Sequence, residues 1–221
     1  MKVLELFAGT RSIGRAFEAR GHEVLSVDWD DRFDDIDINA DVLEVSYRDI
    51  LEKIGRVDVV WASPDCTTYS IAAISHHRTR EEHGNLAGVS DYARACDRVN
   101  MHFHNLIMML TPDLWFIENP RGGMRKMDFM HGLERYTVTY CQYGDTRMKP
   151  TDIWTNHPDP QFKPMCHNGD PCHVSAPRGA KTGTQGLKGS VDRSRIPAEL
   201  CDHIVDISEA YIAKKRHETT L

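Results

Sequence analysis

A short apolar segment that ends at a proline constrains the fold of this chain more than any other feature. Residues 57–62 read V-D-V-V-W-A, a nearly continuous apolar run typical of a strand buried on both faces of a parallel sheet. Pro64 ends that strand, because proline lacks the amide hydrogen that a sheet ladder uses. Cys66 follows at once, where open α/β sheets bind their ligands. The segment therefore predicts an α/β fold with a thiol at the carboxyl end of a central strand.

Two interpretations of Cys66 are open at this point. Most free cysteines are small buried hydrophobic residues that serve only packing. The four residues after Cys66, T-T-Y-S, instead offer hydroxyl groups around the thiol rather than an apolar pocket. A single cysteine does not decide between a packing role and a chemical role, whereas a second reactive side chain at the same sheet edge would favour the chemical role.

The N-terminal part of the chain follows the order strand, glycine turn, helix, strand. The turn at residues 8–10 precedes an expected helix at 12–20, and the second strand ends in Asp28 and Trp29. Backbone amides of the turn and the helix N-terminus can bind an anionic group. Asp28 can accept hydrogen bonds from ribose hydroxyls, and Trp29 can stack on a purine. This βαβ unit predicts a site for a nucleoside-containing cofactor.

The remaining chain alternates between strand-like and helix-like segments. Strands are expected at residues 114–117, 137–141 and 151–155, and helices at 47–54, 91–110 and 197–214. The alternation predicts a mostly parallel central sheet with helices on both faces. Residues 71–88 combine histidines and arginines without an apolar period, and we predict a mobile loop there.

The length of 221 residues fits one moderate domain with a small appendage. Residues 1–155 are predicted to form the catalytic and cofactor-binding domain. Residues 156–195, rich in proline and glycine, are predicted to be a loop-rich insertion. Residues 196–221 are predicted to form a C-terminal helix that packs on the first domain.

Charge and composition limit the partners and the compartment. The chain has a net charge of -6, yet residues 121–195 hold 12 Lys and Arg against 7 Asp and Glu. That basic segment fits either a polyanion-binding surface or a solvated loop. No apolar run is long enough for a membrane span, and the N-terminus leads straight into a strand rather than a secretion signal. Six cysteines without such a signal indicate a cytoplasmic protein with reduced thiols.

The second residue is Glu118, in the segment E-N-P that follows the apolar run at residues 114–117. Neighbouring strands would bring Cys66 and Glu118 into one cleft beside the cofactor. A thiolate and a carboxyl group that face a nucleoside cofactor favour covalent addition to a ring with assisted protonation.

Four segments resemble a known family. L-F-A-G-T-R-S-I-G, S-P-D-C-T-T-Y-S, E-N-P and Q-Y-G-D-T-R-M-K are similar, in this order, to motifs of the DNA (cytosine-5)-methyltransferases, in a compact form like those carried by phages. The resemblance implies a Rossmann-like methyltransferase fold, S-adenosylmethionine as cofactor and DNA as partner. It assigns cofactor binding to Phe7, Ala8, Gly9, Thr10, Asp28, Trp29, Asp41, Val42 and Pro64.

The resemblance also implies a mechanism. Cys66 would add to carbon 6 of cytosine, which makes carbon 5 nucleophilic enough to take a methyl group. Glu118, protonated, would hold ring nitrogen 3 and the exocyclic amine. Arg147 or Lys149 would steady the base oxygen or a phosphate. The base must leave the helix stack, and the loop at 71–88, with its arginines Arg78 and Arg80, would close over it.

Departures from the family pattern leave alternatives open. Asp65 stands where a second proline is usual, and its charge is expected to raise the pKa of the neighbouring thiol. Arg11 stands where a glycine is common. These changes leave room for transfer of a modified group, for action on an already modified cytosine, or for a catalytically silent DNA-binding homologue. An adenine amino-methyltransferase fits less well, because Cys66 stands where that class has an aromatic residue.

The insertion at residues 156–195 is too short for the usual target-recognition domain. We therefore expect short or lax sequence specificity, or a protein partner that selects the target. The insertion contains two Cys-His pairs, in which Cys166, Cys172 and His173 are candidate ligands of a structural zinc ion. The alternative is that they are surface residues of an irregular loop. Cys141 and Cys201 are expected to pack in the core.

Overall fold

The computed structural model describes residues 1–175 and 189–219. A seven-stranded sheet in the order β3-β2-β1-β4-β7-β9-β8 forms its centre. The strands, in sheet order, are Ile38–Asn39, Glu23–Asp28, Lys2–Leu6, Val59–Ala62, Leu114–Pro120, Pro150–Thr155 and Arg135–Thr139. The first five run parallel, and β9 and β8 run antiparallel to their neighbours. The predicted mostly parallel sheet is confirmed.

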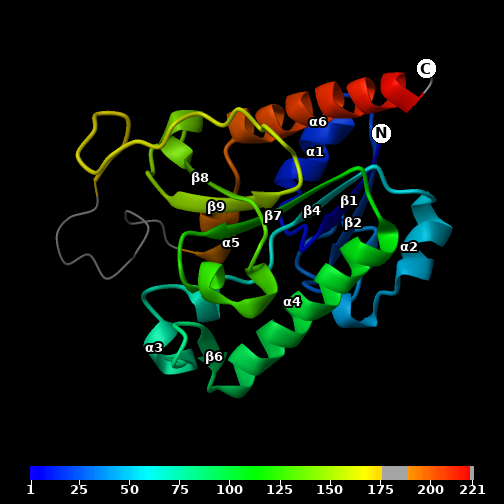
Figure 1. Ribbon diagram of the computed structural model, residues 1–221. Coiled ribbons are helices and arrows are strands. Elements are labelled where there is room, and N and C mark those ends of the chain that lie inside the picture. The colour runs from blue at the N-terminus through cyan, green and yellow to red at the C-terminus, as the bar shows by residue number, and fades with distance from the viewer. Residues whose placement is uncertain (176–188, 220–221) are drawn as a thin grey trace.

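Helices cover both faces of this sheet (Figure 1). They are α1 Ser12–Ala19, α2 Tyr47–Ile54, α3 Ile74–His77, α4 Asp91–Leu110, α5 Ser190–Ser194 and α6 Ala198–Thr219. Side chains alternate along β1, so that Val3 joins the core under α1 and α6, and Leu4 joins the core under α2 and α4. The result is a three-layer α/β/α arrangement. Within the described residues, no helix combines the length and apolar character that crossing a membrane requires.

Local sequence signals place the ends of α2 and α4 where we predicted them, whereas α6 begins one residue later than predicted and continues to Thr219 instead of Lys214. Helix α2 spans the predicted residues because Ser46 and Asp49 form a capping box at its start, and Gly55 ends it with φ of 75°. Helix α4 also spans the predicted residues. Ser90 accepts a hydrogen bond from the Ala93 amide at its start.

Strand β7 is longer than the sequence predicted. It continues through Glu118 to Pro120, because β9 pairs with it from Phe116 to Pro120 and sets Glu118 opposite Ile153. The expectation that Glu118 lies just past the strand end was therefore wrong. The carboxyl group sits on the rigid strand itself.

The predicted loop at residues 71–88 is also wrong. This segment forms α3 and a two-stranded hairpin, β5 Arg78–Arg80 and β6 Leu86–Gly88. The Arg78 side chain is fully buried and pairs with Asp97 of α4 at 2.8 Å, so it does not close over a nucleotide. Arg80 stays exposed. A charge pattern along the chain does not reveal that an arginine has a buried partner on another helix.

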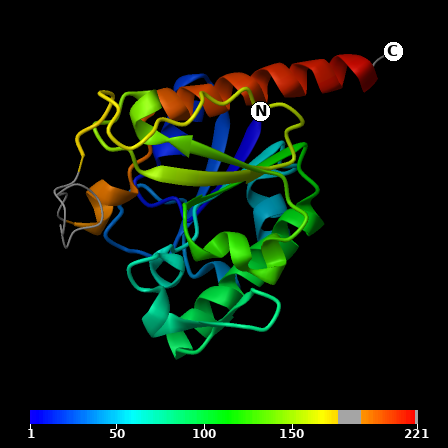
Figure 2. The same ribbon diagram turned by 60° about the vertical axis from the view of Figure 1, so that its left-hand side comes forward.

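The segment that follows β9 runs beside the start of α6 (Figure 2). Phe162 stacks on His203 of α6 with ring centroids 5.3 Å apart, and Pro160 accepts a hydrogen bond from His203 at 2.8 Å. Helix α6 in turn packs on α1, where Arg20 pairs with Asp206 and Glu209. Part of the predicted insertion, residues 176–188, lies outside the described residues.

Candidate active site

Two adjacent parallel strands place Cys66 and Glu118 at the same edge of the sheet. Strands β4 and β7 pair in register, with Ala62 opposite Ile117, so the loop after β4 and the end of β7 meet. Asn119 donates a hydrogen bond to the Pro64 carbonyl at 2.9 Å. That bond joins the S-P-D-C and E-N-P segments directly.

The loop that carries Cys66 is held from several sides. Cys66 precedes the 3₁₀ helix η2, Thr67–Tyr69, and Arg78 binds both the carbonyl and the hydroxyl of Thr68, at 3.0 and 2.8 Å. Asp65 accepts hydrogen bonds from the Thr67 amide and the Tyr92 hydroxyl, both at 2.5 Å. The thiol is therefore held on a fixed loop, and Cys66 is half-buried rather than sealed in the core.

Burial raises the pKa of the Cys66 thiol to about 11, and the carboxylates of Asp65 and Glu118 act in the same direction. The positive charge of Lys149 opposes them. The thiol is consequently protonated at neutral pH in the free protein. The sequence argument from Asp65 gave the correct direction but missed burial as the larger cause.

Glu118 is buried, and burial raises the pKa of its carboxyl group. The charge of Lys149 and hydrogen bonds with Tyr140 and Ser63 act against that shift. The Tyr140 hydroxyl donates to Glu118 Oε1 at 3.2 Å. We did not predict Tyr140 or Ser63, since nothing in the local sequence marks Tyr140 as a partner of a residue on β7.

The two basic candidates have different surroundings. Arg147 is buried and binds the carboxylate of Asp145 through Nε and Nη2. Lys149 Nζ lies 4.5 Å from the centre of the Tyr140 ring and donates to the Arg193 carbonyl at 2.9 Å. The charge of Lys149 acts on both Cys66 and Glu118. Burial lowers the pKa of Lys149. Lys149 is thus a cation that acts electrostatically on both candidate catalytic residues.

The predicted cofactor residues follow the ends of four neighbouring parallel strands, in the sheet order β3-β2-β1-β4. Asp28 accepts from the amides of Gly9 and Asp30 at 2.8 and 2.9 Å, which fixes the turn after β1 against the end of β2. Trp29 is 70% exposed, so its ring is accessible for stacking. These positions form one continuous row along the sheet edge.

The rest of that row comes from loops after the strands. Phe7, Ala8, Gly9 and Thr10 follow β1, and Pro64 is buried after β4. Asp41 is exposed and starts the 3₁₀ helix η1, Val42–Glu44, by accepting from the Leu43 amide at 2.9 Å. Val42 is buried.

The backbone of Arg11 accounts for the glycine that is common at this place. Arg11 has φ of 54°, in the left-handed region that glycine adopts without cost. Its guanidinium is buried and pairs with Asp35 at 2.8 Å and with Glu18. These ion pairs hold the arginine in a conformation that its side chain disfavours.

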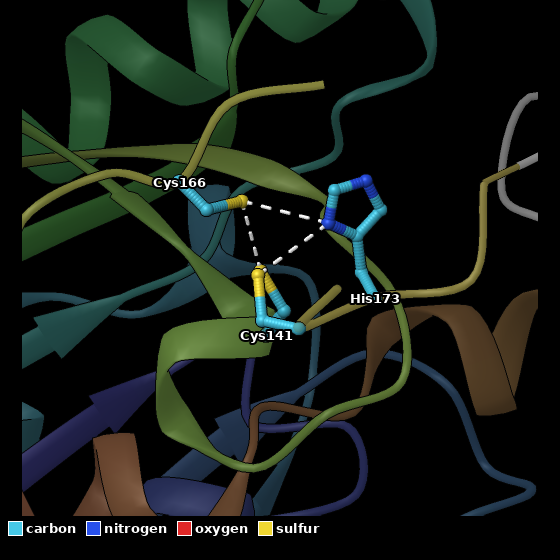
Figure 3. A group of neighbouring side chains, drawn as sticks. Cys141, Cys166 and His173 are labelled. Atoms are coloured by element: carbon cyan, nitrogen blue, oxygen red, sulfur yellow. Dashed lines mark hydrogen bonds between the residues drawn. The ribbon is translucent and has the colours of Figure 1, made fainter. Parts of the chain in front are cut away.

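The candidate zinc ligands Cys166, Cys172 and His173 lie together in space, and a fourth residue joins them. The Cys141 sulfur lies 3.0 Å from that of Cys166 (Figure 3). Cys141 is buried, but its expected role in core packing was an incomplete interpretation, because its thiol faces three other potential ligands. Cys201 lies on α6 and is buried in the core that this helix covers, as predicted.

Known proteins resemble this chain in sequence and in fold. No protein-family model matches the chain. The chain is 30% identical over 232 residues to a probable DNA (cytosine-5)-methyltransferase of Frog virus 3 (isolate Goorha), which covers 94% of this chain and all of the relative. A putative DNA modification methyltransferase encoded within an E. coli prophage has a similar structure, with a TM-score of 0.52 and 17% identity over 70% of this chain. A Spodoptera frugiperda DNMT2 mutant matches with a TM-score of 0.47 and 17% identity over 70% of this chain.

The fold is therefore the Rossmann-like fold of S-adenosylmethionine-dependent methyltransferases. The identity to the viral relative over nearly the whole of both chains goes further. The chain belongs to the DNA (cytosine-5)-methyltransferase family, as its motifs indicated. It spans about half the length of the solved structures that it matches, 46% and 49%.

Proposed function

We propose that this protein transfers a methyl group from S-adenosylmethionine to carbon 5 of cytosine in DNA through a covalent adduct of the flipped base with Cys66. The observation that carries the proposal is the meeting of Cys66, Glu118 and Lys149 at one sheet edge, where the charges of Glu118 and Lys149 act on the Cys66 thiol and that of Lys149 acts on Glu118. Packing alone does not require a half-buried thiol beside a buried carboxyl group and a lysine.

Each of the three groups has a role in this reaction. Cys66 loses its proton to solvent and its sulfur bonds to carbon 6, while Glu118 donates a proton to ring nitrogen 3. The raised pKa of Glu118 favours the protonated form that this step needs. Lys149 steadies the base oxygen. Carbon 5 then gains the methyl group and loses its proton to solvent. The bond between carbon 6 and the Cys66 sulfur breaks as ring nitrogen 3 returns its proton to Glu118.

The row of residues after β3, β2, β1 and β4 fits S-adenosylmethionine. Asp28 would accept from the ribose hydroxyls, the exposed Trp29 would stack on the adenine, and Asp41 would meet the adenine amine. Phe7, Ala8, Gly9, Thr10, Val42 and Pro64 would complete the site. When bound, the cofactor supplies an electrophilic methyl group on a sulfonium.

DNA is the proposed substrate, and the target base must be extruded before Cys66 can reach it. Arg147 would then release the Asp145 carboxylate and bind a DNA phosphate instead. Because the insertion after β9 is short, we propose that target selection is lax or is assisted by a protein partner.

Duplex DNA that contains 5-fluorocytosine tests the proposal. A base can remove a proton from carbon 5 but cannot remove fluorine in the same way, so the covalent adduct persists. Incubation with S-adenosylmethionine is expected to give a stable complex with the cross-link on Cys66, located by peptide mass analysis. Cys66→Ser should give none, and Cys96→Ser, at a buried cysteine of α4, should still give it. Absence of the adduct would favour a silent DNA-binding homologue.

The identity of the transferred group needs a second measurement. Nucleosides from DNA of cells that express the protein are expected to include 5-methylcytosine. A different mass increment on cytosine, with the Cys66 adduct intact, would instead show a modified group or an already modified target.

A further inference from the structure

Four side chains outside the candidate active site converge with their ligand atoms toward one point. Cys141 lies in the 3₁₀ helix η5, Tyr140–Tyr143, and Cys166, Cys172 and His173 lie in the segment after β9. All four ligand atoms are within 4.8 Å of one another. Figure 3 shows the Cys141 and Cys166 sulfurs and the His173 ring pointing toward one another from separate segments.

The separations among these atoms match those of a tetrahedral site. The Cys172 sulfur lies 3.6 Å from the Cys141 sulfur and 3.6 Å from His173 Nδ1, and the Cys166 sulfur lies 3.7 Å from His173 Nδ1. Zinc bonds of about 2.3 Å to sulfur and 2.0 Å to nitrogen place tetrahedral ligands about 3.5–3.8 Å apart. The Cys141–Cys166 pair, at 3.0 Å, would have to separate further, and the two remaining pairs lie within 4.8 Å.

We propose that Cys141, Cys166, Cys172 and His173 bind one structural zinc ion. Three thiolates and an imidazole are a soft ligand set that suits zinc, and binding would release the three thiol protons to solvent. Four protein ligands leave no open position for a substrate or an activated water, so the role is structural.

The ion would fasten the segment after β9 to the part of the chain that carries the candidate active site. Cys141 directly follows Tyr140, whose hydroxyl binds Glu118. Two hydrogen bonds already join the same parts: the Cys166 amide donates to Thr139 Oγ1 at 3.0 Å, and the Val174 amide donates to the Thr146 carbonyl at 2.9 Å. A segment without helix or strand gains a fixed position in this way.

The chain offers a matched pair of histidines for the test. His173 and His167 each follow a cysteine, but the His167 side chain is 90% exposed and lies near Asp170 at 3.8 Å. The full-length protein, purified in reductant without a metal-binding tag, should contain about one zinc per chain by elemental mass analysis. His173→Ala and Cys166→Ser should lower zinc affinity by more than the roughly 10- to 100-fold that loss of an outer-shell partner costs. His167→Ala should retain the metal.

Cobalt substitution in the wild-type protein tests the same site and does not depend on whether a variant folds. Wild-type protein stripped of metal and loaded with Co²⁺ should show the intense absorption of tetrahedral cobalt with thiolate ligands, and zinc should displace it. Failure of the wild-type protein to bind zinc or Co²⁺ would overturn the proposal, as would full zinc retention in Cys166→Ser. A Cys141–Cys166 disulfide in freshly isolated protein, seen as resistance of both to alkylation without reductant, would also overturn it. None of these measurements uses DNA, so they are independent of the methyltransferase proposal.

Discussion

Cys66 and the cluster of Cys141, Cys166, Cys172 and His173 place thiols in opposite settings. Cys66 lies apart from the clustered thiols, on a loop held by Asn119, Arg78 and Tyr92 through ordinary hydrogen bonds. In the cluster, thiols and an imidazole face one another, and three of the four belong to a segment without helix or strand. The Cys66 thiol is held in place by the surrounding protein, whereas the clustered cysteines would themselves hold the segment after β9 in place.

Cys66 and the clustered cysteines also differ in the charged groups that surround them. Burial raises the pKa of Cys66, the charges of Asp65 and Glu118 raise it further, and the charge of Lys149 opposes them. The clustered residues have one another among their nearest polar partners, beside Gln142, which donates to the Cys172 sulfur at 3.6 Å. Mutual contacts of this kind suit groups that share a metal ion. A cysteine's neighbours, more than its burial, therefore distinguish a candidate nucleophile from candidate metal ligands.

The largest expected effect belongs to Cys66→Ser. Loss of the nucleophile should lower methyl transfer by at least about a thousandfold, because serine is a far weaker nucleophile at neutral pH. The zinc content should be unchanged. Radiolabelled methyl incorporation into DNA and elemental analysis of the same preparation measure both. A variant that retains methyl transfer would remove the distinction between the two groups of thiols.

Arg78→Met tests how the Cys66 loop is held. The substitution leaves the charge of Asp97 without its buried partner and should lower the free energy of unfolding by about 3–5 kcal/mol. Arg80→Met, at the exposed end of the same strand, should change it by less than about 0.5 kcal/mol. Urea denaturation of both variants decides this. Equal stabilities would mean that the Arg78 contacts contribute little to the fold.

Lys149→Gln and Arg147→Gln distinguish the roles of the two basic side chains. Lys149 acts on both reacting groups, so its loss should lower kcat by about 100-fold. Arg147 is bound to Asp145, and its proposed phosphate contact should appear mainly in KM for DNA. Steady-state methylation of a defined duplex, on variants matched for folding by circular dichroism, measures both constants. The reverse pattern would assign the base contact to Arg147.

Sequence patterns were sufficient where the determining contacts are local. Ser46, Asp49 and Gly55 define α2 within a few residues of one another, and the strand before Pro64 was recognisable from its composition alone. The order of motifs also placed Cys66 and Glu118 together, because adjacent parallel strands end at a common edge.

Long-range partners explain the failures. Arg78 is buried because Asp97 of α4 neutralises it, and Cys141 joins its cluster across 25 residues of chain. Tyr140 reaches Glu118 only because β9 and β8 complete the sheet in antiparallel order. None of these contacts produces a period or a short motif, so the chain alone did not reveal them.

The smallest effect is expected for Asp65→Asn, which tests whether charge tunes the Cys66 thiol. Burial is the larger cause of its raised pKa and Asp65 the next, so removal of the charge should lower the pKa only part of the way. At pH 8, below a pKa of about 11, the thiolate fraction rises tenfold for each unit by which the pKa falls. Iodoacetamide should therefore alkylate Cys66 about two- to tenfold faster in the variant.

Asparagine keeps one side-chain oxygen for the hydrogen bond from the Thr67 amide, and its NH2 group can donate to the Tyr92 hydroxyl oxygen in place of the second carboxylate oxygen, so the loop should stay in place. Alkylation is followed by peptide mass analysis across a pH series, and the rising limb of the rate should move to lower pH. Glu52→Gln, an exposed charge removal on α2, should leave the rate unchanged. An unchanged or slower rate in Asp65→Asn would mean that burial alone sets the Cys66 pKa. The clustered cysteines should react at the same rate in all three proteins, because their environment contains neither carboxylate.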